Sequence, residues 1–168
     1  MSKTKIIIAL IALIVFVFGM TAVSNAVAGE KHKLRIVGNV TKWEQIEVGD
    51  QEGHVIALFD KQGIYHNLEG KPFCNGWFAR EMGLLDLNVK TGVFASCDGY
   101  DEITDADGDK FYIAFKGKSD KKGKLKGEMK VVKGTGKFEG IRGKGTWVFY
   151  PVTATWGYTD CAWEVELP

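Results

Sequence analysis

The sequence has none of the short motifs that mark common catalytic and cofactor sites. It contains no G-x-S-x-G, no H-E-x-x-H, no C-x-x-C and no phosphate-binding P-loop, and only three of its 168 residues are histidines. The acidic run from Asp105 to Asp109 resembles a calcium loop, but Lys110 stands where such a loop needs glycine. We therefore interpret the run as an Asp-Gly hairpin turn, and we expect no cofactor and no metal site.

The chain also lacks an excess of charge of one sign. Without Lys3 and Lys5, residues 29–168 carry 20 basic and 21 acidic residues. A nearly neutral domain argues against nucleic acid as the main partner. The lysine-rich stretch 116–133 is a local exception, in which charged and apolar residues alternate. This alternation is typical of a solvated sheet face, and an anion-binding patch is the alternative interpretation.

The first 28 residues have the organisation of a secretory signal peptide. Lys3 and Lys5 precede an unbroken apolar run at 6–18, and Ala26-Val27-Ala28 forms an A-x-A cleavage site. The apolar run is shorter than the roughly 20 residues that span a bilayer. We expect an N-terminal signal helix at 1–28 that is cleaved after Ala28, leaving residues 29–168 as one exported domain, periplasmic or secreted, with no stable membrane span. An uncleaved N-terminal anchor is the alternative.

Residues 29–168 consist of short stretches in which apolar and polar residues alternate. Seven to nine such stretches, separated by turns and with no convincing helix, predict an antiparallel all-β sandwich or barrel. The stretch 33–48 would exceed 50 Å at about 3.3 Å per residue, so we expect a bulge or kink between residues 38 and 42. We interpret residues 71–83 as a long loop or capping segment over one barrel mouth.

A glycine-rich stretch at 134–147 is the most distinctive local feature. It holds five glycines, with Phe138 and Ile141 between them. Glycine is unfavourable in a helix interior and allows backbones to approach closely. The stretch therefore predicts a tight corner between strands, with Phe138 and Ile141 turned inward. A mobile linker is the alternative interpretation.

The pattern G-T-G-K-F-E-G-I-x-G-x-G at 134–145 resembles the hairpin signature of the allene-oxide-cyclase-like barrel superfamily, which includes dirigent proteins. The resemblance implies a single closed antiparallel barrel of about eight strands. It also implies an isomerase or cyclase activity, in which an apolar cavity moulds a reactive substrate. The match does not reach the positions of the family's catalytic residues, so no catalytic residue is assigned.

An apolar barrel that holds a few polar groups is the usual form of a small-molecule site. Polar residues on otherwise apolar strands, and aromatic residues in loop-like segments, are therefore the candidates for ligand binding. The alternative is that carboxylates at strand ends satisfy turn amides and that the tryptophans belong to a filled core. The predicted ligand-binding residues are His54, Asp60, Trp77, Cys97, Asp98, Tyr100 and Trp156.

Three cysteines in an exported chain predict one disulfide and one remaining thiol. We favour pairing of Cys74 with Cys97, although the sequence leaves the pairings with Cys161 open. The remaining thiol is either a small buried hydrophobic residue or a reactive or metal-binding group.

These features together favour an exported small barrel that binds a small, largely apolar molecule in its lumen. The alternatives are an isomerase or cyclase of the allene oxide cyclase type and an oligomerising structural barrel. Residues 54–59 are apolar on both faces, which favours a strand covered on both sides and would suit an interface between copies of the chain.

Overall fold

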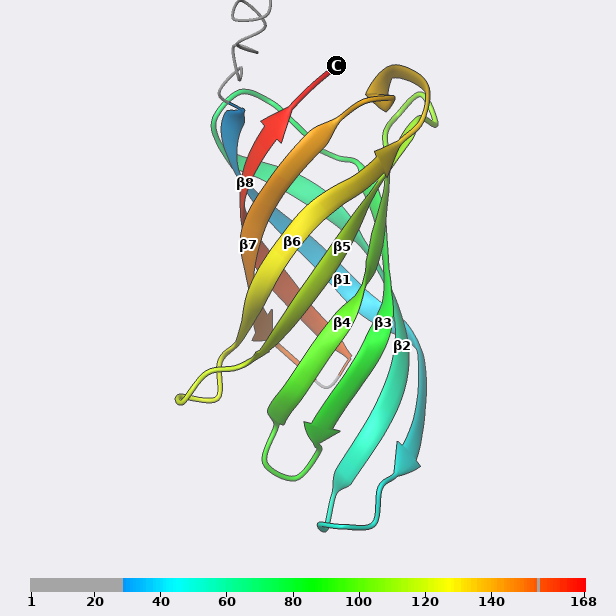
Figure 1. The fold of residues 1–168 in the computed structure, drawn as a ribbon, viewed down its shortest axis with the longest axis vertical. Helices are drawn as coiled ribbons and strands as arrows, with labels where there is room; N and C mark the ends of the chain where they lie inside the picture. Colours follow the sequence, from blue (N-terminus) through cyan, green and yellow to red (C-terminus); the bar gives the residue numbers. More distant parts are fainter. Residues whose placement is uncertain (1–28, 154) are drawn as a thin grey trace, which may run out of the picture.

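The computed structural model describes residues 29–153 and 155–168, so the expected signal helix lies outside the described residues. Eight strands follow one another along the chain (Figure 1). Their bounds are β1 Glu30–Glu47, β2 His54–Glu69, β3 Phe78–Asn88, β4 Val93–Thr104, β5 Lys110–Ser119, β6 Leu125–Gly134, β7 Arg142–Pro151 and β8 Trp156–Glu166. A short 3-10 turn, η1 (Gly136–Phe138), precedes β7. None of the described residues forms a helix long and apolar enough to cross a membrane.

Each strand pairs with the next in antiparallel fashion, and β1 pairs with β8 to close the barrel. The predicted all-β closed barrel of about eight strands is therefore confirmed. The alternation of apolar and polar residues explains why the strands form a barrel with an apolar interior, because the side chains of odd- and even-numbered residues point to opposite faces of a strand. In β5, for example, Phe111 and Ile113 are fully buried inside the barrel, whereas Lys116 is exposed on the outer wall.

The first strand contains the predicted irregularity. The register between β1 and β2 shifts between Val40 and Lys42, which leaves Thr41 without an opposite residue. This bulge bends β1 and reverses the faces of the residues that follow it. Pairing of β1 with β8 ends at Asn39. Among the described residues, the lower part of β1 therefore pairs with β2 alone (Figure 1).

Inward-facing glycines let neighbouring strands bend and approach closely. Gly117 on β5 lies directly opposite Gly127 on β6. A Cβ atom at Gly127 would lie only 1.9 Å from the carbonyl oxygen of Lys116. Glycine is the residue expected where a strand bends at a barrel corner.

The glycine-rich corner closes the upper end of the barrel. Phe138 on η1 and the nearby Ile141 are both buried, as predicted. Phe138 packs against Trp77 with ring centroids 5.4 Å apart and against Phe111 at 5.3 Å. The segment before β3 contributes Phe73, whose ring lies 5.5 Å from Trp77. Part of the predicted loop 71–83 therefore caps this mouth, but its second part is strand, because β3 begins at Phe78.

The acidic run at 105–109 forms the predicted hairpin turn. Asp105 Oδ1 accepts hydrogen bonds from the backbone N–H groups of Asp107 and Asp109 at 2.9 and 3.0 Å. Gly108 supplies the left-handed conformation of the turn, with φ of 90°. Lys137 Nζ lies 2.5 Å from both Asp105 Oδ2 and Asp107 Oδ2, so one ammonium group offsets part of the negative charge of this turn.

The expected disulfide is not present. Cys74, Cys97 and Cys161 are all free thiols, and all three are buried. Burial raises the pKa of the Cys97 thiol to about 12 and the pKa values of Cys74 and Cys161 well above their ordinary range. A thiol that stays protonated is a poor nucleophile and metal ligand. The three cysteines therefore act as small core residues.

Candidate functional site

Three charged side chains form a continuous row on the inner wall of the barrel. Lys61 on β2 is directly opposite Glu81 on β3, and Glu81 is directly opposite Asp101 on β4. The exposed fractions of Lys61 and Asp101 are only 6% and 3%. Lys61 Nζ forms an ion pair with Glu81 Oε2. Charged groups rarely occur inside a domain without a structural or functional reason.

Asp101 is the member of this row with spare hydrogen-bonding capacity. Its Oδ2 accepts a hydrogen bond of 2.7 Å from the hydroxyl of Tyr65, which is buried on β2. Its Oδ1 is buried and has no hydrogen-bond partner among the described residues. Leaving such an atom unpaired costs about 1–3 kcal/mol. A donor from a bound molecule would remove this cost.

The surroundings of Asp101 favour its neutral form. Burial, and after it the neighbouring charge of Glu81, raise the pKa of the carboxyl group to about 7, although the hydrogen bond from Tyr65 and the charge of Lys61 lower it. Burial is also the main cause of the raised pKa of Tyr65. The lumen thus holds an acid that can gain or lose a proton close to neutral pH.

Apolar and aromatic residues form the rest of the inner wall. Ile103 and Ile113 are fully buried, and Trp163 is nearly so. Toward the lower end, Phe94, Phe115 and Phe149 are only partly buried. Phe149 also lies next to the charged row, with Lys61 Nζ 5.7 Å from its ring centre. The upper end is therefore sealed by aromatic packing, and the lower end is the more open one.

Four of the seven predicted ligand-binding residues lie on the outer wall or at its lower rim rather than in the lumen. His54 lies where β2 begins and bonds to Asp50 at 2.5 Å and to Asp86 at 2.9 Å. Asp60 points outward and accepts two hydrogen bonds from Arg80, from Nε to Oδ1 at 3.1 Å and from Nη2 to Oδ2 at 2.5 Å. The remaining two outer-wall residues are Asp98 and Tyr100, both exposed.

The other three predicted residues lie in different places. Cys97 faces the lumen and is buried. Trp77 is half-buried in the aromatic packing that closes the upper end. Trp156 is exposed at the start of β8. The seven predicted residues are thus not brought together into one site, and their role in binding stays a prediction.

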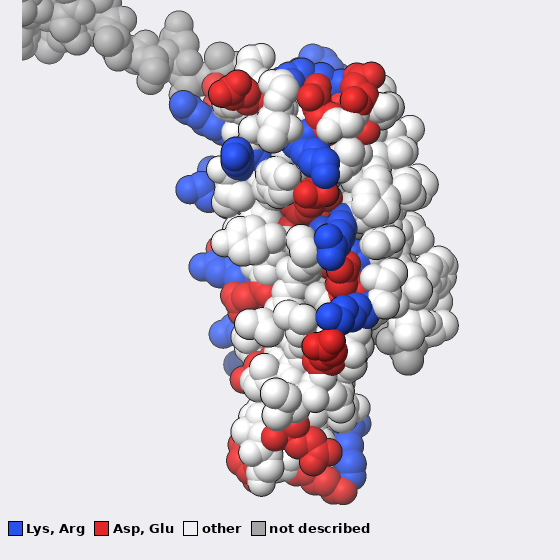
Figure 2. All heavy atoms as spheres, turned by 90° about the vertical axis from the view of Figure 1, so that its right-hand side faces the viewer, with Lys and Arg blue, Asp and Glu red and all other residues white. Residues whose placement is uncertain are grey.

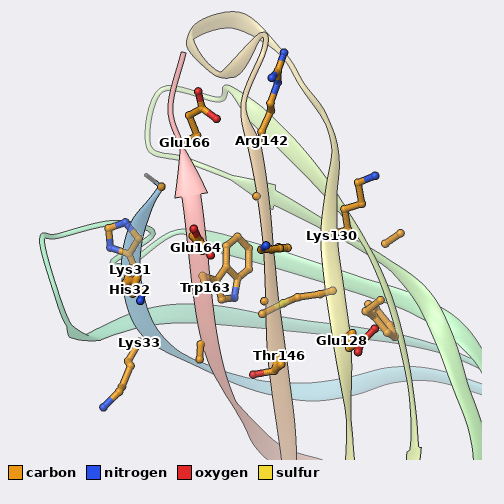
Figure 3. A pocket seen from close by; sticks show the side chains of 18 of the residues that line it. Lys31, His32, Lys33, Glu128, Lys130, Arg142, Thr146, Trp163, Glu164 and Glu166 are labelled. Atoms are coloured by element: carbon orange, nitrogen blue, oxygen red, sulfur yellow. The ribbon is translucent and has the colours of Figure 1, made fainter. Parts of the chain in front are cut away.

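A broad open depression of about 1380 Å³ crosses the outer wall from β4 to β8 and reaches the start of β1. Figure 3 shows Glu128 and Lys130 on β6, Thr146 on β7 and Glu164 on β8 along its surface. Asp98 and Tyr100 lie at its β4 side. Its lining contains lysines and carboxylates in similar numbers, so it is a poor match for a largely apolar ligand.

To find the charged row from the sequence, one would have to know for each strand whether its odd-numbered or its even-numbered residues face the lumen. Glu81 lies in a segment that we interpreted as a loop, and Asp101 follows a bulge. The register between β3 and β4 shifts between Asp86 and Leu87, so that Phe94 and Cys97 both face inward although they differ in parity. Once Cys97 is placed inside, Gly99 and Asp101 follow on the same face.

Comparison with known proteins supports the fold. No protein-family model matches the sequence, and no curated protein matches it. Two solved structures are similar in fold, the pterocarpan synthase dirigent proteins GePTS1 and PsPTS1, with TM-scores of 0.51 and 0.50. Each is 13% identical in sequence, and the alignments cover 88% and 83% of this chain and 97% of each of those chains. The chain therefore has a dirigent-like barrel fold.

Proposed function

We propose that this barrel binds a small, largely apolar molecule in its lumen and that the molecule donates a hydrogen bond to Asp101. The observation that carries the proposal is the unpartnered Oδ1 of Asp101, which is buried among apolar walls. A hydroxyl or phenol group would supply the missing donor, while an apolar skeleton would pack against the inner aromatic residues. The partly buried Phe115 and Phe149 mark the lower end as the entrance.

A matched pair of probes tests this proposal. 4-Propylphenol carries the donor, and its methyl ether, 4-propylanisole, lacks it. We expect the protein to bind the phenol about tenfold more tightly than the ether, because a hydrogen bond to a charged or strongly polar group contributes about 1.5 kcal/mol. Asp101→Leu should abolish this preference, whereas Asp98→Asn on the outer wall should keep it. Equal affinity for both probes, or a preference that survives Asp101→Leu, would contradict the proposal.

A second candidate function is catalysis by proton transfer in the same lumen. Asp101, with its pKa raised to about 7, could act as a general acid or base near neutral pH. The two similar structures are named pterocarpan synthases, which makes an enzymatic barrel a reasonable candidate. An isomerase or cyclase should convert an unsaturated epoxide with a rate that changes near pH 7, and Asp101→Asn should lose this activity. If the protein binds 4-propylphenol but does not convert the epoxide, this second candidate function is wrong and binding is the function of the lumen.

We also propose that the chain is exported. The support is the order of charged, apolar and small residues at 1–28. The mass of the protein recovered from expressing cells should correspond to a chain that begins at Gly29. Recovery of only the full-length chain in the membrane fraction would contradict cleavage.

A further inference from the structure

The charges of the protein are divided unequally between two parts of the barrel. Residues 110–150, which form β5 to β7 and their connections, contain 12 basic and only three acidic residues, Asp120, Glu128 and Glu139. Residues 29–168 as a whole carry 20 basic and 21 acidic residues. The rest of the domain is therefore strongly acidic. A separation of this kind creates a positive potential over one wall of an almost neutral molecule.

The basic side chains of this wall are placed close to one another. Lys118 on β5 is directly opposite Lys126 on β6, and Lys130 on β6 is directly opposite Lys144 on β7. Directly opposite side chains on one face have Cβ atoms about 5 Å apart, and like charges at that distance destabilise the sheet. Two such pairs on neighbouring strands are unfavourable for the isolated protein and favourable for binding an anion.

Most of these lysines have no carboxylate partner within the described residues. Lys126 pairs with Asp120 at 3.0 Å, but no ion pair involves Lys118, Lys130 or Lys144. The nearest opposite charges on the adjoining strands are Glu128, opposite Lys116, and Glu164, opposite Lys144. All the lysines of the two like-charge pairs are exposed.

The wall formed by β1 to β4 is different. Most basic residues of these strands and their connections have partners, including Lys42 with Glu44, Lys71 with Glu30 and Lys90 with Glu52. Figure 2 faces this side of the barrel and shows a column of alternating blue and red side chains. The wall of β5 to β7 faces the viewer in Figure 1 and is seen in profile at the left of Figure 2, where blue side chains project.

We propose that the outer wall of β5 to β7 binds a linear polyanion with closely spaced phosphate or sulfate groups. The shape of the wall favours a chain over a planar membrane, because Lys130, Arg142 and Lys144 line the broad depression on this side. Glu128, Glu164 and Glu166 line the same depression, so the unpaired basic side chains, and not the net charge of the depression, would hold the anion. A flat bilayer cannot follow a concave surface, whereas a polymer can lie within it. Neutralising the lysine pairs would also remove the repulsion that the unbound protein carries.

Two triple variants with the same change in net charge test the proposal. The first, Lys118→Gln with Lys130→Gln and Lys144→Gln, removes basic groups from the wall. The control, Lys42→Gln with Lys71→Gln and Lys90→Gln, removes the same charge from lysines that already have partners. Binding of labelled long-chain polyphosphate and of heparin to residues 29–168 is measured by fluorescence anisotropy over a range of NaCl concentrations. The two probes distinguish phosphate from sulfate chemistry.

We expect the wall variant to bind at least about tenfold more weakly than the unmodified protein and to show a salt slope that is lower by about 3. The control variant should change affinity by less than about threefold. Equal losses in both variants would show a non-specific effect of net charge and overturn the proposal. Absence of binding to both polymers at about 0.1 M NaCl, or tighter binding to vesicles with phosphatidylglycerol than to either polymer, would also overturn it. If the triple variant unfolds, Lys130→Gln is compared with Lys42→Gln, and only the Lys130 variant should then lower the salt slope, by about 1.

Discussion

Replacing Asp101 by asparagine tests the buried charged row most quantitatively. The folded protein raises the pKa of this carboxyl group from 3.8 to about 7. A raised pKa means that the folded state binds the proton more tightly than the unfolded state. The stability associated with the protonated group is therefore fully present below pH 3.8 and is lost as the pH rises toward 7.

The size of this effect follows from the difference between the two pKa values. At about 1.36 kcal/mol per pKa unit, it corresponds to about 4 kcal/mol of unfolding free energy. Asparagine resembles the protonated carboxyl group, since it is neutral and its Oδ1 can still accept the hydrogen bond from Tyr65. Asp101→Asn should thus have nearly the stability of the unmodified protein at pH 4 and should be more stable by up to about 4 kcal/mol at pH 8.

Urea denaturation of residues 29–168 at pH 4, 6 and 8 measures this difference. Asp98→Asn is the matched control, because Asp98 lies on the same strand but points outward and is exposed. The control should follow the unmodified protein at every pH. The reasoning would be refuted if Asp101→Asn kept the pH dependence of the unmodified protein, or if it were as strongly destabilised at pH 8 as at pH 4.

Three further predictions address the fold and its electrostatics. Gly127→Ala should lower the unfolding free energy by about 2–3 kcal/mol in urea denaturation, because its Cβ would meet the Lys116 carbonyl oxygen; unchanged stability would contradict the close approach of β5 and β6. Phe138→Ala should cost about 3–5 kcal/mol by the same assay, since its ring fills the upper closure, whereas a surface-like effect below about 1 kcal/mol would show that the corner does not seal the barrel. Hydrogen bonds that the His54 ring donates to the carboxylates of Asp50 and then Asp86 raise the pKa of His54, so its stabilising effect is present below pH 6.5 and is lost as the pH rises through the raised value. His54→Asn should therefore lower the urea midpoint at pH 6 more than at pH 9, and a larger loss at pH 9 would contradict this assignment.

The fold was predictable because its signals are local. Clean alternation in β5 and β6 fixes which residues face the core, and the position of Phe138 and Ile141 between glycines predicts an inward corner. The bulge near Thr41 was also predictable, because the length of β1 exceeds the size of a small barrel.

The site was not predictable, because it depends on register between strands that are distant in the sequence. Lys61, Glu81 and Asp101 follow one another at intervals of 20 residues, and only the pairing of β2, β3 and β4 places them in one row. A single charged residue in an apolar strand is more often an outward residue or a strand end, as Asp60 and Asp98 are. Apolar side chains on both faces of residues 54–59 favoured a covered strand, but Ile56 and Leu58 are about two-fifths exposed on the outer wall.

The most direct test of the central claim is a carboxyl carbon NMR titration of residues 29–168, with the Asp101 resonance assigned by its loss in Asp101→Asn. An acid enclosed in the lumen should titrate with a midpoint near pH 7, and its resonance should shift when 4-propylphenol is added. A midpoint near pH 4 with no response to the phenol would show that Asp101 is solvated, and it would contradict both the buried charged row and the binding site built on it.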